Sequence, residues 1–204
     1  MNLDQLPINL FDLVVIVVLL AGIAKGRKQG MSEELLSLLK WLGILFGCAA
    51  LYHPGGQFVC GFTSMFGPLS SYMLAYVGGA LVVLLVLAGI KRALGGKLLG
   101  SDIFGRSEYY LGMASGLVRF SCMLLAALAL LNARYYTPLE VRAMEKYDEQ
   151  WYGSSYFPGL HSLQTTVFDK SFTGQWIKQN LGFLLIKPTE PDKRENHQKD
   201  MFVP

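Results

Sequence analysis

The sequence carries little charge. Asp, Glu, Lys and Arg make up 16% of its 204 residues, whereas 52% are hydrophobic and the mean hydropathy is +0.35. An ordinary soluble domain has about 25% charged residues. The low charge and the long apolar runs exclude an ordinary soluble domain and indicate an integral membrane protein. No block of Lys and Arg alternates with aromatic residues, so nucleic acid is not an expected partner.

Motifs that carry enzyme chemistry are absent from the sequence. The three histidines are isolated, the three cysteines form no C-x-x-C pair, and neither a Walker A motif nor G-x-S-x-G occurs. Lone cysteines in apolar stretches are usually packing residues. We therefore expect a protein that is not an enzyme and that holds no cofactor and no metal.

Four apolar runs are long enough to cross a bilayer, which takes about 20 helical residues. The predicted fold is an all-α integral membrane protein, a four-transmembrane-helix bundle with a C-terminal amphipathic helical tail. The predicted spans are residues 8–24, 33–52, 69–90 and 109–131. The first run is interpreted as a retained span, since no Lys or Arg precedes it and no cleavage site of the A-x-A kind follows it.

The cations between the spans predict the orientation. The connectors after the first and third spans carry seven Lys or Arg residues, namely Lys25, Arg27, Lys28, Lys91, Arg92, Lys97 and Arg106. The connector between the second and third spans carries none, and neither do the residues before the first span. Because cytoplasmic loops are enriched in Lys and Arg, both termini are expected outside the cytoplasm.

The chain changes character after Leu131. Residues 1–131 are predicted to form the membrane domain, 132–186 an extracytoplasmic amphipathic helical region, and 187–204 a disordered tail. Thr137 and Glu140 have the spacing of a capping box, with a helix starting at Pro138. Two later helical faces are apolar but too short to span, and are expected on the outer leaflet or on the end of the bundle. They consist of Leu160, Leu163, Val167 and Phe168, and of Phe172, Trp176, Ile177, Leu181, Leu184 and Leu185.

Glycines recur every fourth residue in three of the spans. They are Gly22, Gly26 and Gly30, then Gly43 and Gly47, then Gly112 and Gly116. Glycines stacked on one face let helix backbones approach closely inside a membrane. Glycine is also simply common in membrane helices. The repetition in three spans favours helix packing, within the bundle or between copies of the chain.

Several short motifs, in this order, resemble the colicin V production protein (CvpA) family. They are Asn9-Leu10-Phe11-Asp12, the basic turn from Gly26 to Gly30, Glu34-Leu35-Leu36 leading to Trp41, Gly112 and Gly116 with Arg119, and Trp151, Ser154-Ser155 and Pro158. The likeness covers about residues 8–170. Lys40 and Phe120 depart from the family's pattern, in which small residues stand. The resemblance implies a multi-pass protein of the bacterial inner membrane linked to colicin V production or export and to envelope homeostasis.

Three charged residues inside the spans are the candidate functional or structural residues: Asp12, Arg119 and Lys40. A charge near the bilayer centre costs about 2.5–3.5 kcal/mol on insertion scales, so it should find a partner or water. Asp12 and Arg119 are expected either to form a structural ion pair or to line a path for an ion or solute, unless Asp12 extends outward to the headgroups. Lys40 is expected to face the bundle or to reach the headgroups along its own side chain.

Two classes of function follow from these features. The first is a non-enzymatic bundle that assists toxin production or export, or envelope homeostasis, through other envelope or export proteins. The second is a small oligomeric channel or transporter with a polar path lined by Asp12 and Arg119. A chain this short forms a pore more readily as a homo-oligomer than alone. The lipid bilayer is the one certain partner of either class.

Overall fold

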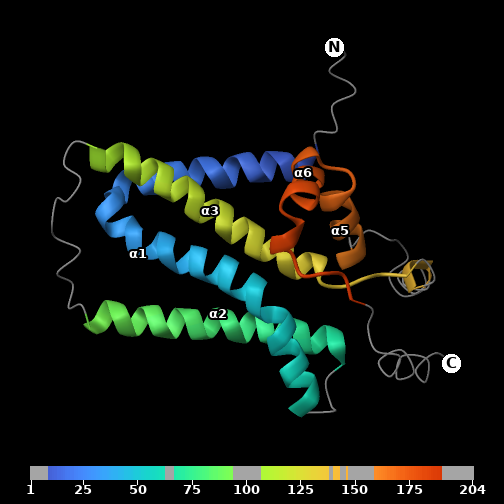
Figure 1. Cartoon of the computed structure of the whole chain (residues 1–204). Coiled ribbons are helices and arrows are strands. Elements are labelled where there is room, and N and C mark those ends of the chain that lie inside the picture. The colour runs from blue at the N-terminus through green and yellow to red at the C-terminus, as the bar shows by residue number, and fades with distance from the viewer. Residues whose placement is uncertain are drawn as a thin grey trace, which may run out of the picture.

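A computed structural model of the chain describes residues 9–62, 67–93, 107–137, 140–142, 146 and 159–189 (Figure 1). The described residues are helical apart from turns, connectors and one isolated bridge between Arg134 and Thr189. Within these residues, three helices are long and apolar enough to cross a membrane: Glu34–Phe62, Pro68–Ile90 and Glu108–Asn132. The elements are α1 (Leu10–Phe62), α2 (Pro68–Ala93), α3 (Glu108–Asn132), α5 (Leu160–Phe168), α6 (Phe172–Asn180) and the 3-10 helix η3 (Gly182–Leu184).

Helix α1 contains the first two apolar runs and folds back on itself at Gly30. This residue has φ 73° and ψ 169°, a left-handed conformation that glycine adopts at little cost. The break divides α1 into a first half, residues 10–29, and a second half, residues 31–62. The first half is not among the three helices apolar enough to span, since Asp12 lies at one end and three cations lie at the other.

The second half of α1 continues ten residues beyond the predicted end of that span at residue 52. The stretch from His53 to Phe62, expected to be a connector, is helical although Pro54 lies inside it. Proline removes one backbone hydrogen bond and bends a helix without necessarily ending it. Figure 1 shows the last turns of α1 turning away beside the start of α2. Here Gly55 and Gly56 face Ala75 and Tyr72 of α2.

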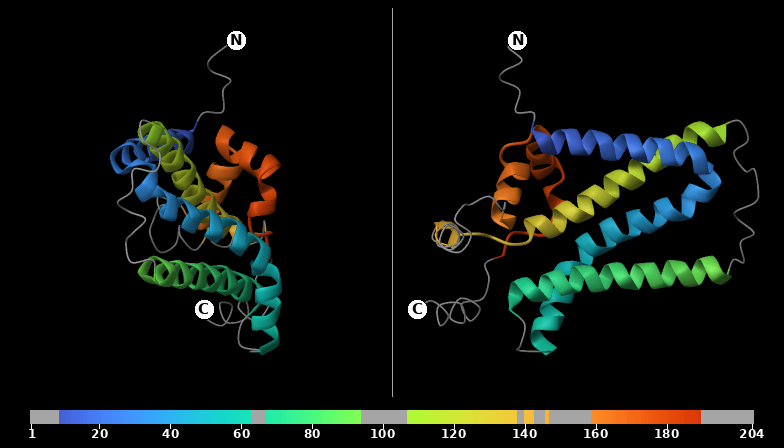
Figure 2. Two further views of the ribbon diagram at one scale, coloured as in Figure 1. Left: turned by 60° about the vertical axis from the view of Figure 1, so that its left-hand side comes forward. Right: turned by 180° about the vertical axis from the view of Figure 1, so that it is seen from behind.

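The helices form a layered bundle. Both halves of α1 pack on α3, and α2 packs on the second half of α1. In Figures 1 and 2 the turn at Gly30, the end of α2 and the start of α3 lie at one end of the bundle, whereas α5 and α6 lie at the other. The cations of the first connector, Lys25, Arg27 and Lys28, are therefore at the end opposite the C-terminal helices.

The buried core lies between α1, α3 and the C-terminal helices. In the apolar stretch of α2, 6% of the residues are buried, against 44% in α3. Helix α2 therefore turns most of its apolar surface outward. The core residues include Ile44, Leu45, Cys48, Cys122, Leu125, Ala129, Phe168, Ile177, Leu185 and Ile186. The described cysteines Cys48 and Cys122 act as packing residues, as the sequence predicts.

The C-terminal helices are shorter than the sequence predicts, and their apolar faces are divided. Helix α6 ends at Asn180 and η3 follows, so the predicted continuous helical face to Leu185 is wrong. In α5, Val167 and Phe168 are buried but Leu160 and Leu163 are exposed. In each of the two apolar faces, some side chains are buried against the end of the bundle and the others are exposed.

Residues 187–189, predicted to be the start of the disordered tail, belong to the described structure. The backbone of Thr189 donates to Ala133 at 2.9 Å and accepts from Tyr135 at 3.1 Å, which ties this segment to the end of α3. The capping box exists, since Thr137 and Glu140 exchange hydrogen bonds of 3.2 and 3.3 Å. The predicted helix start at Pro138, the motif at residues 151–158 and the tail beyond residue 189 lie outside the described residues.

Candidate functional site

A glycine contact brings α3 against the first half of α1. Gly22, Gly26 and Gly30 face Gly112 and Gly116, and the carbonyl oxygens of each helix point at the glycines of the other. A Cβ on Gly112 would lie 2.6 Å from the Gly26 oxygen, and a Cβ on Gly26 would overlap the Gly112 oxygen. Only glycine permits this approach, in which backbone touches backbone as in close-packed membrane helices.

The two other glycines singled out by their spacing have looser surroundings. A Cβ on Gly43 would meet the side chain of Val83 at 3.3 Å, which is a tight but not a backbone contact. A Cβ on Gly47 would meet nothing within 4 Å. The second half of α1 therefore does not use Gly47 for close packing within the chain.

The close glycine contact places Arg119 beside Glu34. Arg119 follows Gly116 by three residues and so lies on the same face of α3, while Glu34 follows the break at Gly30 by four residues. The Arg119 Nη1 atom donates to Glu34 Oε2 at 2.6 Å. The side chains are 7% and 0% exposed, so this ion pair is buried between the second half of α1 and α3.

The expected pair of Asp12 and Arg119 is absent, and the hypothesis of that pair is wrong. Asp12 lies ten residues before Gly22, the residue of α1 that faces Gly116, which is about 15 Å along the helix. Arg119 instead finds its carboxylate within four residues of the turn. Glycine packing fixes the register of the two helices, and that register brings Glu34 rather than Asp12 to Arg119.

Asp12 joins the beginning of α1 to the beginning of α6. Its carboxylate accepts backbone N–H groups from Asn9 at 2.9 Å, Phe172 at 3.3 Å and Thr173 at 2.9 Å. The first backbone N–H groups of a helix have no partner inside it, and a carboxylate there is favoured by the helix dipole. Asp12 therefore acts as a shared cap for two helices, and the acid in this apolar run fastens the C-terminal helices.

Helix α6 is also fastened by Ser171. The Ser171 hydroxyl accepts from the Gly174 N–H at 2.9 Å and donates to the Val167 carbonyl at 2.7 Å. Farther along, the Asn132 amide donates to the Ile186 carbonyl at 2.9 Å. These buried polar contacts tie α6 to the end of α5 and the segment after η3 to the end of α3.

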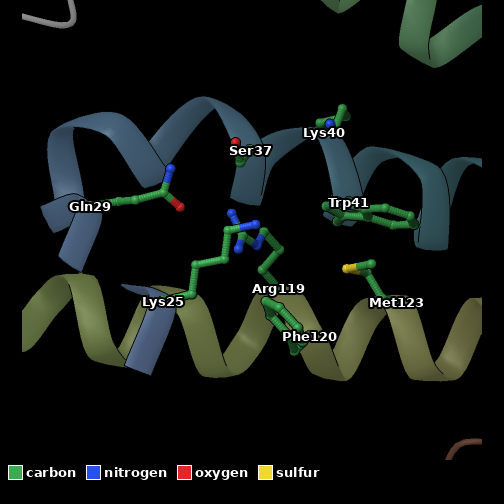
Figure 3. Close-up of a pocket in the computed structure, with 8 residues that line it drawn as sticks. All are labelled: Lys25, Gln29, Ser37, Lys40, Trp41, Arg119, Phe120 and Met123. Atoms are coloured by element: carbon green, nitrogen blue, oxygen red, sulfur yellow. The ribbon is translucent and has the colours of Figure 1, made fainter. Parts of the chain in front are cut away.

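Lys40 lies on a cavity of about 270 Å³ between the two halves of α1 and α3 (Figure 3). Arg119 lines the same cavity, so the structure brings two of the three candidate charges together and leaves Asp12 elsewhere. The Lys40 ammonium also lies 5.8 Å from the ring centroid of Trp41. The lining residues are Lys25, Gln29, Ser37, Lys40, Trp41, Arg119, Phe120 and Met123.

Sequence reasoning missed Glu34 as a site residue. Glu34 stands at the start of an apolar run, where a charge looks like the end of a span. The available signal was its spacing: it lies four residues after a glycine that repeats with Gly22 and Gly26. Among the described residues, no three His, Cys, Asp or Glu residues gather into a group that could hold a metal ion.

The comparison with known families agrees with the resemblance seen in the motifs. Residues 11–165 match the family model described as colicin V production protein. This match covers more than two thirds of the chain and includes Asp12, the glycine contact, Glu34 and Arg119. No curated protein and no solved structure matches the chain.

Proposed function

Because the chain belongs to the colicin V production protein family, we propose that it is a non-enzymatic protein of the bacterial inner membrane that assists toxin production or export, or envelope homeostasis. The observation that carries this proposal is the layer formed by α5, α6 and η3 at one end of the bundle. Asp12 fastens that layer to the first helix, and aromatic side chains project from it.

Four spans are the topology that suits this role. The first half of α1 has 20 residues, about 30 Å of helix, which equals the hydrocarbon thickness of a bilayer. Up to Ala24 its outward side chains are apolar, including Leu13, Ile16 and Leu20. With the basic turn in the cytoplasm, both termini and the layer of α5, α6 and η3 lie on the extracytoplasmic side.

The outer layer offers a surface to other envelope or export proteins. Phe172, Trp176 and Phe183 are more than half exposed, although Ile177 and Leu184 of the same segment are buried. Aromatic side chains held on a fixed backbone are typical anchors of protein interfaces and of the membrane surface. A layer of this kind can bind a partner at the outer face of the membrane without catalysing a reaction.

A small oligomeric channel or transporter is the second candidate, and the cavity beside Arg119 is the observation that favours it. Asp12 no longer supports a shared path, since its oxygens are occupied by three backbone N–H groups. Solute flux into proteoliposomes that contain only this protein distinguishes the candidates. The first proposal predicts no flux above that of empty vesicles.

The variant D12A tests the role of the layer, with D169A as its matched control. Loss of a helix cap costs about 0.5–2 kcal/mol, so D12A should loosen α6 while the spans stay folded. Asp169 pairs with Lys178 on the surface, where both side chains are more than half exposed, and such a pair contributes little. In cells that lack the native protein, D12A should reduce secreted toxin or raise sensitivity to detergent, and D169A should restore both.

Protein abundance in the membrane is measured in the same cells. A D12A protein present at the level of the D169A protein, with full toxin secretion and full detergent resistance, contradicts the proposal that the outer layer carries the function.

A further inference from the structure

The cavity beside the buried ion pair gathers cations from all three of its walls. Lys25 comes from the first half of α1, Lys40 from the second half and Arg119 from α3. Figure 3 shows the ends of Lys25 and Arg119 side by side in the middle of the cavity, with the Gln29 amide turned toward them. The remaining lining is Ser37 and the apolar residues Trp41, Phe120 and Met123.

These cations outnumber the described acids that face them. Glu34 is bonded to Arg119 and balances one positive charge. Among the side chains that the structure describes, which do not include that of Glu33, no carboxylate lies within 4 Å of the Lys25 or Lys40 ammonium. These two positive charges are therefore not balanced by a described carboxylate. Like charges brought close together repel each other, and an anion between them lowers that cost.

The donors around the cavity suit a phosphate group. A guanidinium presents a planar fork of N–H donors to phosphate oxygens, and ammonium groups add point charges. Gln29 Oε1 is buried without a hydrogen-bond partner, and a half-turn of the amide would present its NH2 group to an anion instead. Ser37, on the second half of α1, supplies a hydroxyl donor.

The depth and the volume of the cavity restrict the kind of ligand further. Lys25 lies five residues before the turn at Gly30, about 8 Å along the helix, so the cavity begins near the headgroup depth of a bilayer. A volume of about 270 Å³ lies just below the range for drug-sized ligands, which suits a group as small as a phosphate. Met123, 37% exposed, continues the lining onto the apolar outer surface of α3.

We propose that this cavity binds a phosphate group, carried either by the headgroup of an anionic lipid or by free phosphate. Lys25 and Lys40 supply the positive charge, and Arg119, which Glu34 holds in place, supplies guanidinium N–H donors. The site lies within the spans and is independent of the outer layer, so the proposal does not rest on the function proposed above.

The test measures the thermal unfolding midpoint of the purified full chain in an uncharged detergent. Three probes are added in separate titrations: inorganic phosphate, phosphatidylglycerol, and zwitterionic phosphatidylcholine. The test variant is K25Q/K40Q, which leaves the Glu34–Arg119 pair intact. The matched control is K28Q, on the same half of α1, since Lys28 lines a different hollow with Leu20, Ile23 and Met113.

We expect the wild-type midpoint to rise with phosphatidylglycerol and not with phosphatidylcholine. The apparent affinity should fall about tenfold or more in K25Q/K40Q, because two charge-assisted hydrogen bonds are lost, and should change little in K28Q. Without any anion, K25Q/K40Q should unfold at or above the wild-type midpoint, because the variant has no repelling lysines.

The probes distinguish a lipid headgroup from free phosphate as the ligand. A rise with inorganic phosphate as well shows that the free group suffices, and a rise with phosphatidylglycerol alone assigns the site to a lipid headgroup. No rise with either probe, or the same loss of affinity in K28Q as in K25Q/K40Q, overturns the proposal. A K25Q/K40Q protein that unfolds below the wild type without anion also contradicts it.

Discussion

Glu34 and Arg119 show how a membrane bundle keeps a charged pair inside. Each charge alone would be costly away from water, and the 2.6 Å contact lets the two neutralise each other. Their attraction offsets the loss of hydration and adds little net stability beyond it. The pair nevertheless joins the second half of α1 to α3.

Single and double substitutions of the pair test this account. E34A and R119A should each destabilise the chain by about 3–5 kcal/mol, since each leaves one buried charge without its partner. The double variant should recover most of that loss. The measurement is thermal unfolding in detergent, with membrane abundance beside it. A double variant that is as unstable as the sum of the single variants would show that the two residues act independently.

The sequence indicated that Arg119 needs a partner, because an arginine ten residues inside an apolar run cannot remain alone. It did not indicate which acid. The coexistence of one acid and one arginine in otherwise apolar spans suggested Asp12. The break at Gly30 that brings Glu34 to Arg119 is a property of one backbone torsion. The sequence could not indicate the partners of Asp12 either. The hydrogen bonds from Phe172 and Thr173 span sequence separations of 160 and 161 residues.

At the scale of the helices, the glycine contact between α1 and α3 determines the geometry of the cavity and the ion pair. The two backbones touch at Gly22, Gly26, Gly112 and Gly116. Arg119, about one turn after Gly116, then meets Glu34, about one turn after Gly30. The four-residue spacing predicted a packing face on each helix. It could not indicate which face meets which, because Gly43 and Gly47 have the same spacing and no such contact.

The variants G26A and G47A compare a glycine in the close helix contact with a glycine outside it. A methyl group on Gly26 would overlap the Gly112 carbonyl, and overpacking of this kind costs about 1–3 kcal/mol. A methyl group on Gly47 meets nothing within 4 Å, so G47A should gain about 0.5–1 kcal/mol from the better helix former. Thermal unfolding of both proteins gives the comparison. Equal effects of the two substitutions would show that the contact does not hold the bundle together.

The ends of the helices were the least predictable elements. The prolines and glycines from His53 to Pro68 indicated a connector, yet α1 continues to Phe62 because α2 packs against Gly55 and Gly56. Tertiary contact overrides local preference here. Likewise, the apolar face expected across residues 172–185 is divided between α6 and η3, since the chain bends at Leu181 to bury Leu184 and Leu185.

At the scale of the whole molecule, the two ends of the bundle differ in chemistry. The turn at Gly30, with Lys25, Arg27 and Lys28 before it, lies at one end, and the C-terminal helices with their exposed aromatic residues lie at the other (Figure 2). Our account places the membrane between them, with the first half of α1 as a fourth span. This assignment puts the cation cavity on the cytoplasmic side and the outer layer beyond the opposite leaflet.

The most direct test labels single cysteines in intact cells, in a chain whose three native cysteines are replaced. The variants are K28C at the basic turn, Q57C near the end of α1 and K178C on α6, all at exposed positions. An impermeant thiol reagent should label Q57C and K178C from outside, and K28C only after lysis. If K28C and K178C react alike, the first half of α1 does not cross the membrane and the account is wrong.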